Sequence, residues 1–191
     1  MSTDSYTLDL VSGEYYANCT VCSSYDASHD YGDPEESETP IPYDLIIKDG
    51  PTAIGDYQFE RKDYLRSVTI PDSVTVLGAY LFDECENLEE IVLPSYITAI
   101  PGYTFSGCDK LTSITIPDGV KTIGKNAFLD CHSLTSLVIP DSVTSLGSNL
   151  FKYCSQLYTI TYNGTYSDWI NIDKSENWDY GFNNKASAVL V

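Results

Sequence analysis

Hydrophobic residues recur along this chain with a period of 23 residues. Four registers share this step, and each is occupied by a single residue type. They hold leucine (Leu65, Leu88, Leu111, Leu134, Leu157), proline (Pro71, Pro94, Pro117, Pro140), phenylalanine (Phe59, Phe82, Phe105, Phe128, Phe151) and cysteine (Cys85, Cys108, Cys131, Cys154). A fixed period of this length indicates a repeat protein, in which each repeat forms one structural unit.

The hydrophobic pattern changes within each period. The segment LTSITIP, residues 111–117, alternates between apolar and polar positions, with Ile114 and Ile116 inward and Thr115 outward. This alternation predicts a short strand, and the proline that follows ends it because proline cannot donate to a sheet ladder. The next residues, GVKTIG, turn the chain. Phe128 and Cys131 then lie three positions apart, which is the spacing of one helical turn on one face.

A single unit of this kind buries too few apolar side chains to offset the ordering of its own backbone. Units stacked side by side complete each other's burial, and their strands pair at a spacing of about 4.8 Å. The pattern therefore predicts a solenoid with a parallel sheet along one face, in which each repeat is packed between its neighbours.

The whole motif, C-x-x-L-x-x-I-x-I-P-x-x-V-x-x-I-G-x-x-A-F-x-x-C, resembles the BspA-like class of leucine-rich repeat. The match covers residues 43–164, and its degenerate first copy has Lys62 in the cysteine register. The resemblance implies a right-handed leucine-rich-repeat solenoid of 23-residue repeats, with bends and short helical or 3₁₀ turns opposite the sheet. It also implies recognition or adhesion by an extracellular or cell-surface protein of bacteria, without catalysis.

An open stack exposes an apolar face at each end, so we expect three parts. Residues 1–42 are the N-terminal cap, with a hairpin over 6–22 and an acidic loop over 23–42. Residues 43–164 hold about five repeats and a last strand, and residues 165–191 are the C-terminal cap. The last coil is expected to be covered by apolar and aromatic side chains (Tyr162, Tyr166, Trp169, Ile172, Trp178).

The formal net charge is −18, and residues 1–47 contain no Lys or Arg. This balance repels phosphate backbones and anionic lipid, so we expect no nucleic-acid partner. No apolar run approaches the roughly 20 residues that span a bilayer, so membrane insertion is not expected. The first residues lack the pattern of a signal peptide. Either the protein stays inside the cell or a leader was removed, and the sequence does not separate these two alternatives.

The four cysteines in register are candidates for disulfides or for a metal site. Neighbouring Cα atoms in such a stack lie near 5 Å apart, within reach of a disulfide. Their side chains point the same way, however, which opposes the required torsion. We expect reduced, buried thiols packed behind the phenylalanines, since free cysteine behaves as a small hydrophobic residue.

The N-terminal cap holds a lone C-x-x-C, formed by Cys19 and Cys22, with His29 nearby. Three states remain open: free thiols, one local disulfide, or zinc with an aspartate as fourth ligand. The acidic segment DYGDPEESE, residues 30–38, lacks the spacing of a calcium loop, so we expect a solvated loop there. No cofactor is expected.

No catalytic motif is present in the sequence. Of the two histidines, His132 directly follows Cys131, and the period buries that cysteine. The two side chains diverge in most backbone conformations, which argues against a Cys–His pair. We therefore expect a non-enzymatic protein.

The outward positions of the strands form the candidate binding surface, because only there do successive coils present a continuous ladder. The convex turns vary in sequence and charge, so no shared surface is expected on them. We expect a monomer that binds a protein or glycan ligand, the alternative being a structural spacer without a ligand. The candidate residues are Ser67, Thr69, Glu90, Val92, Ser113, Thr115, Ser136 and Val138.

Overall fold

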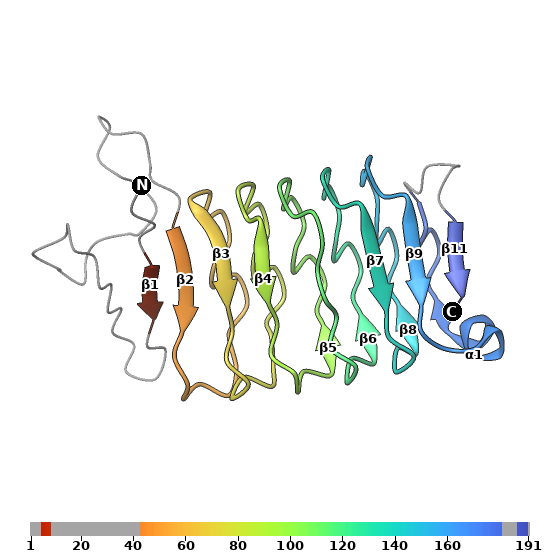
Figure 1. The fold of residues 1–191 in the computed structure, drawn as a ribbon, viewed down its shortest axis with the longest axis horizontal. Helices are drawn as coiled ribbons and strands as arrows, with labels where there is room; N and C mark the ends of the chain where they lie inside the picture. Colours follow the sequence, from red (N-terminus) through yellow and green to blue (C-terminus); the bar gives the residue numbers. More distant parts are fainter. Residues whose placement is uncertain (1–4, 9–42, 181–186, 191) are drawn as a thin grey trace, which may run out of the picture.

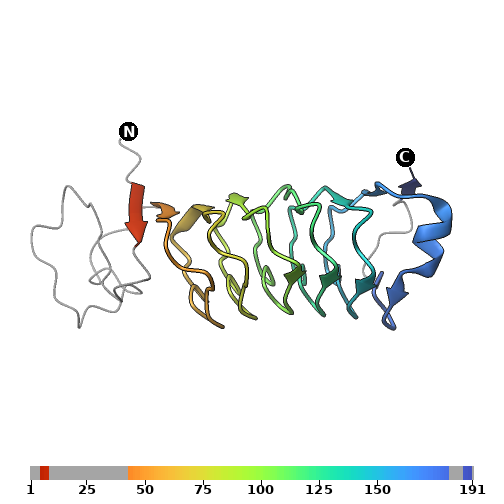
Figure 2. The same cartoon turned by 90° about the horizontal axis from the view of Figure 1, so that it is seen from below.

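The computed structural model of the chain describes residues 5–8, 43–180 and 187–190. The described chain is a stack of parallel coils, and this confirms the predicted solenoid (Figures 1 and 2). Its elements are β1 (Ser5–Leu8), β2 (Tyr43–Ile47), β3 (Leu65–Thr69), β4 (Glu90–Val92), β5 (Ala99–Ile100), β6 (Thr122–Ile123), β7 (Ser136–Ile139), β8 (Ser145–Leu146), β9 (Thr159–Tyr162), α1 (Tyr166–Asn171), β10 (Asp173–Lys174) and β11 (Ser187–Leu190).

The strands form three parallel sheets, in the orders β1-β2-β3-β4, β7-β9-β11 and β5-β6-β8-β10. Within the repeats, residues one period apart lie side by side. Ile100 of β5, for example, pairs with Ile123 of β6, and Val68 of β3 pairs with Ile91 of β4. The sequence period is thus the pairing register of the solenoid.

Backbone hydrogen bonds also join neighbouring coils outside the strands. The amides of Phe59, Phe82 and Phe105 donate to carbonyls of the next coil at 3.0, 2.9 and 2.9 Å. The phenylalanine rings stack in the same order, with centroids 5.4–6.0 Å apart from Phe59 to Phe151. Leucine, phenylalanine and cysteine of every complete repeat are buried, as predicted.

The turn opposite the sheet is a series of tight turns, not a continuous helix. In the fourth coil, Ala127 donates to the Gly124 carbonyl, and Cys131 donates to the Phe128 carbonyl. These i to i+3 bonds are those of a 3₁₀ turn. Each turn contains a left-handed residue, Asn126 at φ 55° and Asp130 at φ 58°, and this backbone conformation interrupts a right-handed helix.

The prediction of a strand over residues 111–117 is wrong. The only pairing of this segment is an isolated bridge between Thr115 and Val138. In Figure 1, the coil between β4 and β7 accordingly carries no arrow on this face. The sheet that ends at β4 and the sheet that begins at β7 are therefore separate at this point.

At the N-terminal end of the stack, β1 pairs in parallel with β2 and extends the first sheet by one strand. The rest of the predicted hairpin over 6–22, and the loop over 23–42, lie outside the described residues.

At the other end, Tyr162 is buried, and Trp169 and Trp178 pack against the core. Ile172 is buried as well. Tyr166 does not cover the last coil as expected, because 66% of it is exposed on α1, a helix without buried residues. The backbone of β11 instead adds a strand beside β9.

Truncation of one ring in the phenylalanine stack should destabilise the whole solenoid. Phe128 is fully buried between two other rings, so we expect Phe128→Ala to lower the free energy of unfolding by about 3–5 kcal/mol. Val138→Ala, at an exposed position, should change it by about 0.5 kcal/mol or less. Denaturant unfolding measures both. Similar values for the two variants would show that the ring stack does not hold the coils together.

Glycine at one turn register permits the close approach of neighbouring coils. A Cβ atom on Gly124 would lie 2.4 Å from the Gly102 amide nitrogen, whereas one on Gly55 would meet nothing within 4 Å. We expect Gly124→Ala to destabilise the protein by about 1–3 kcal/mol or more, because the obstacle is backbone. Gly55→Ala should be neutral or stabilise by up to about 1 kcal/mol. Thermal unfolding of the pair tests this difference.

Candidate functional site

The predicted binding residues lie in two rows on the outward side of the strands, which we call the strand face. Ser67 pairs with Glu90 and Thr69 with Val92, and β7 pairs with β9 in the same register. Seven of the eight candidates are exposed, and Ser67 is half-buried. The rows are Asp44, Ser67, Glu90, Ser113, Ser136, Thr159 and Ile46, Thr69, Val92, Thr115, Val138, Thr161.

The first row begins with a charged cluster. The Arg66 guanidinium donates to both carboxylate oxygens of Asp44, at 2.9 Å from Nε and 2.5 Å from Nη2. This contact lowers the pKa of Asp44, and the Ser67 hydroxyl also donates to the carboxylate at 2.8 Å. At this end of the face, the Ser67 hydroxyl and the Asp44 carboxylate therefore already have hydrogen-bond partners within the protein.

The second row alternates between branched apolar residues and threonine. Ile46, Val92 and Val138 are 44%, 49% and 43% exposed, and the threonines between them add a methyl and a hydroxyl group each. The row therefore offers apolar contact and hydrogen bonding at regular intervals along the stack. Such a surface suits a long ligand better than a small buried one.

The strand face is interrupted between β4 and the following coil. No backbone hydrogen bond joins residues 89–95 to residues 112–118, all of which are described. A depression of about 550 Å³ lies here, between residues 90–95 and 115–119, and we call it the opening. The coils meet again on both sides, where Lys110 donates to the Glu86 carbonyl and Lys121 to the Thr98 carbonyl, at 3.2 and 2.8 Å.

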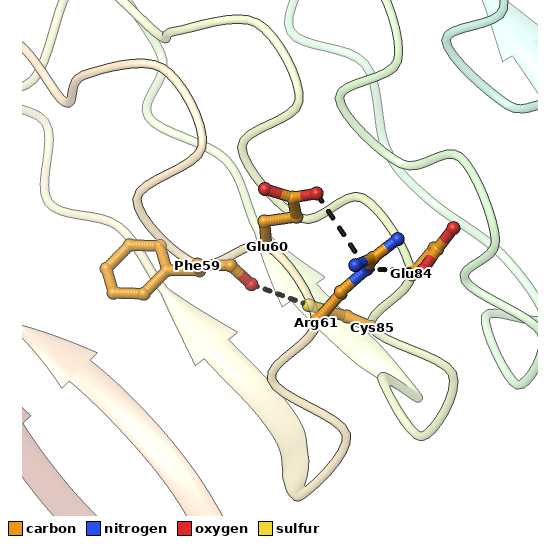
Figure 3. A network of polar contacts seen from close by, with 5 residues as sticks. All are labelled: Phe59, Glu60, Arg61, Glu84 and Cys85. Carbon is orange, nitrogen blue, oxygen red and sulfur yellow. Dashed lines mark hydrogen bonds and ion pairs between the residues drawn. The ribbon is translucent and has the colours of Figure 1, made fainter. Parts of the chain in front are cut away.

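The register cysteines are buried free thiols. Each thiol donates to the carbonyl of a phenylalanine 26 residues earlier, as for Cys85 and Phe59 at 3.0 Å (Figure 3). Burial raises the pKa of the Cys85 thiol to about 12, and it raises the pKa values of Cys108 and Cys131 well above the ordinary range. Since the thiolate is the reactive form, the geometry gives these residues a packing role.

His132 lies apart from the cysteine beside it in sequence. Its Nδ1 atom is 2.9 Å from the Tyr153 carbonyl, while the Cys131 thiol donates to the Phe105 carbonyl. Sequence adjacency therefore produces no Cys–His pair here.

A metal site is not formed within the described ranges, where no group of three His, Cys, Asp or Glu side chains comes together. Cys19, Cys22 and His29 lie outside those ranges. None of the described helices has the length and apolar character to cross a membrane.

Sequence reasoning missed a row of stacked tyrosines on the turns. Tyr57, Tyr80 and Tyr103 stack with centroids 4.7 and 4.4 Å apart, and Lys125 lies 5.5 Å from the last ring. The expectation that the turns share no surface is thus wrong for these three coils. The 23-residue spacing of the tyrosines was the available signal. The left-handed backbone of these tyrosines, at φ 56–61°, could not be predicted from the sequence, because tyrosine rarely adopts this conformation.

Comparison with known families gives a match over most of the repeat region. A family model described as BspA type Leucine rich repeat region matches residues 44–171 in six copies. A search of curated proteins found no match.

Several solved structures have a similar fold. A leucine rich cell surface protein from Faecalibacterium prausnitzii A2-165 is 38% identical, with a TM-score of 0.67 over 71% of this chain and 35% of that one. A leucine-rich repeat protein from T. pallidum is 30% identical, with a TM-score of 0.61 over 63% of this chain and 58% of that one. The pneumococcal vaccine antigen PcpA shares the fold at 21% identity, with a TM-score of 0.62 over 78% of this chain and 36% of that one. This chain therefore spans only part of each of them.

The thiols should be unreactive in the native protein. In a variant with Cys19→Ser and Cys22→Ser, we expect a thiol-reactive dye at pH 8 to leave Cys85, Cys108, Cys131 and Cys154 almost unlabelled, because burial excludes the dye and suppresses the thiolate. All of them should react in guanidinium without reductant. A missing thiol in the unfolded protein would indicate a disulfide between coils and would contradict the assignment.

Proposed function

The chain belongs to the BspA-type leucine-rich repeat family, and on this premise we propose that it is a non-enzymatic module that binds an extended protein or glycan ligand along its strand face. The observation that carries the proposal is the pair of exposed rows, whose residues repeat in one register over successive coils. A ligand with a repeating backbone can meet equivalent groups on each coil.

The chemistry of the rows supports recognition and not catalysis. Outside the Asp44–Arg66 pair, Glu90 is the sole charged member of the two rows, and the remaining side chains are hydroxyl-bearing or aliphatic. Hydroxyls and short aliphatic groups make hydrogen bonds and apolar contacts without activating a nucleophile. The buried cysteines, with raised pKa values for three of the four, agree with this proposal.

We place the module in a bacterial cell-surface or secreted protein. The support is the family and the similar F. prausnitzii structure, which is described as a leucine rich cell surface protein. Because this chain spans 35% of that protein, the proposal concerns one region of a larger surface protein.

A binding screen followed by face variants tests the function. The protein is screened against a glycan array and an array of extracellular host proteins, and affinity for each hit is then measured. Ser136→Arg with Val138→Arg, and Ser113→Arg with Thr115→Arg, should each weaken binding by about tenfold or more, because a long cation blocks the face. Both pairs point to solvent, so the melting temperature should stay near that of the wild type.

Glu86→Arg with Thr98→Arg is the matched control, because both positions are exposed and lie outside the strand face. This control should bind as the wild type does. Equal binding by all variants would place the site elsewhere and overturn the proposal. A screen without hits would favour the alternative of a structural spacer.

A further inference from the structure

The opening differs from the rest of the strand face in its unpaired backbone groups. Ile70 donates to the Val92 carbonyl at 3.1 Å, and Thr135 donates to the Thr112 carbonyl at 3.1 Å. The equivalent amides at this step of the stack are that of Leu93, which lines the opening, and that of Thr112, three residues before its lining. Neither has a hydrogen-bond partner among the described residues. The opening and the residues beside it therefore present two backbone donors whose counterparts, the amides of Ile70 and Thr135, are satisfied within the stack.

The core is also less well covered at this point. The inward side chains beside the opening, Ile91, Leu93, Ile114 and Ile116, are 7%, 8%, 7% and 4% exposed. The same positions one coil away on either side are 0–2% exposed (Val68, Ile70, Leu137, Ile139). Solvent thus reaches apolar side chains through the opening.

Two side-chain contacts that tie other coils together are missing here. The Asp72 carboxylate accepts from the Ser95 amide at 2.7 Å, and the Ser142 hydroxyl donates to the Val120 carbonyl at 2.7 Å. The residues that would make these contacts across the opening are Ser95 and Gly119. Serine is shorter than aspartate and glycine has no side chain, and neither contact is formed at this step of the stack.

The lining of the opening has a definite charge. Glu90 and Asp118 are both exposed at its surface, and none of its lining residues is basic. Val92, Thr115 and Ile116 provide the apolar part of the lining. A complementary ligand therefore carries a cation, an apolar surface and acceptors for backbone amides.

We propose that the opening is the site where the strand face takes an extended peptide segment of a partner protein, and that a lysine or arginine side chain of the peptide pairs with one of the two carboxylates of the lining, Glu90 and Asp118. This inference rests on the proposed function and narrows its ligand to a peptide. Peptide carbonyls accept from the Leu93 and Thr112 amides, in the manner of strand addition to a sheet. A neutral glycan supplies no cation for the two carboxylates.

Blocked octapeptides of alternating threonine and valine, with one central Lys, Arg, Gln or Glu, are the probes. Titration into ¹⁵N-labelled protein, followed by NMR, measures affinity and maps the site. We expect the Lys and Arg peptides to shift the amide signals of Leu93 and Thr112. The Gln peptide should bind about tenfold more weakly, and the Glu peptide should not bind detectably.

Two charge-neutralising variants test this charge pairing. Glu90→Gln with Asp118→Asn should lower affinity for the Lys peptide by about tenfold. The matched control is Glu89→Gln with Asp141→Asn, in which one residue neighbours Glu90 and the other occupies the register of Asp118 one coil later. This control should keep wild-type affinity for the Lys peptide. An equal loss of affinity in both variants would show that only the net charge of the protein matters, and it would contradict the proposed role of Glu90 and Asp118.

A closing variant tests the opening itself. Ser95→Asp with Gly119→Ser restores the two ties, so it should close the opening and weaken binding of the Lys peptide even though it adds a negative charge. Stronger binding by this variant would contradict the role of the opening.

The results separate this inference from the proposed function. Failure of every Lys and Arg peptide, shifts confined to other residues, or binding of maltohexaose at the same amides would overturn the inference. A screened partner that is lost on Ser136→Arg with Val138→Arg, yet is kept by the Glu90 and Asp118 double variant, would also overturn it while leaving the strand face as the binding surface. If the partner binds both double variants as tightly as it binds the wild type, both this inference and the proposed function are overturned.

Discussion

The structure depends on hydrogen bonding between coils in a fixed register. Amides of the turns, such as that of Phe82, donate to the next coil as regularly as those of the strands. Outside the hydrogen bonds of its own turns, each coil therefore satisfies its backbone through its neighbours, and a shift of register would expose the inward side chains. The 23-residue period of the sequence reflects this constraint, because residues one period apart pair side by side in neighbouring coils. Buried thiols follow the same rule, each donating to the carbonyl of a phenylalanine one coil earlier.

A regular stack also dictates where function is possible. Inward positions are occupied by packing, and the tyrosine faces of the turns largely cover one another. The strand face remains exposed, and its rows repeat with the stack. Departures from regularity on this face are informative, because the neighbouring coils define what should be present. The opening between β4 and the next coil is such a departure: it combines unpaired amides, thinner cover of the core and a lining with two carboxylates.

Much of the fold could be predicted from the sequence, because period and alternation act locally and repeat. The inward leucine, phenylalanine and cysteine registers and the outward rows are where the pattern placed them. The missing strand at 111–117 could not be predicted from its own residues, since LTSITIP reads like LTSLVIP, which contains β7. The difference involves residues of neighbouring segments, Ser95 and Gly119, which do not make the contacts that Asp72 and Ser142 make between other coils. Helix α1 had a readable signal, the Thr165–Asp168 capping box, but its exposure depends on the packing of the cap.

Amide hydrogen exchange on the free protein is the most direct measurement of the interrupted ladder. The amides of Leu93 and Thr112 should exchange about 100-fold faster, or more, than those of Ile70 and Thr135, which donate across equivalent steps of the stack. Equal protection of all these amides would mean that the coils are hydrogen-bonded without interruption, and it would contradict the account of a strand face with a built-in opening.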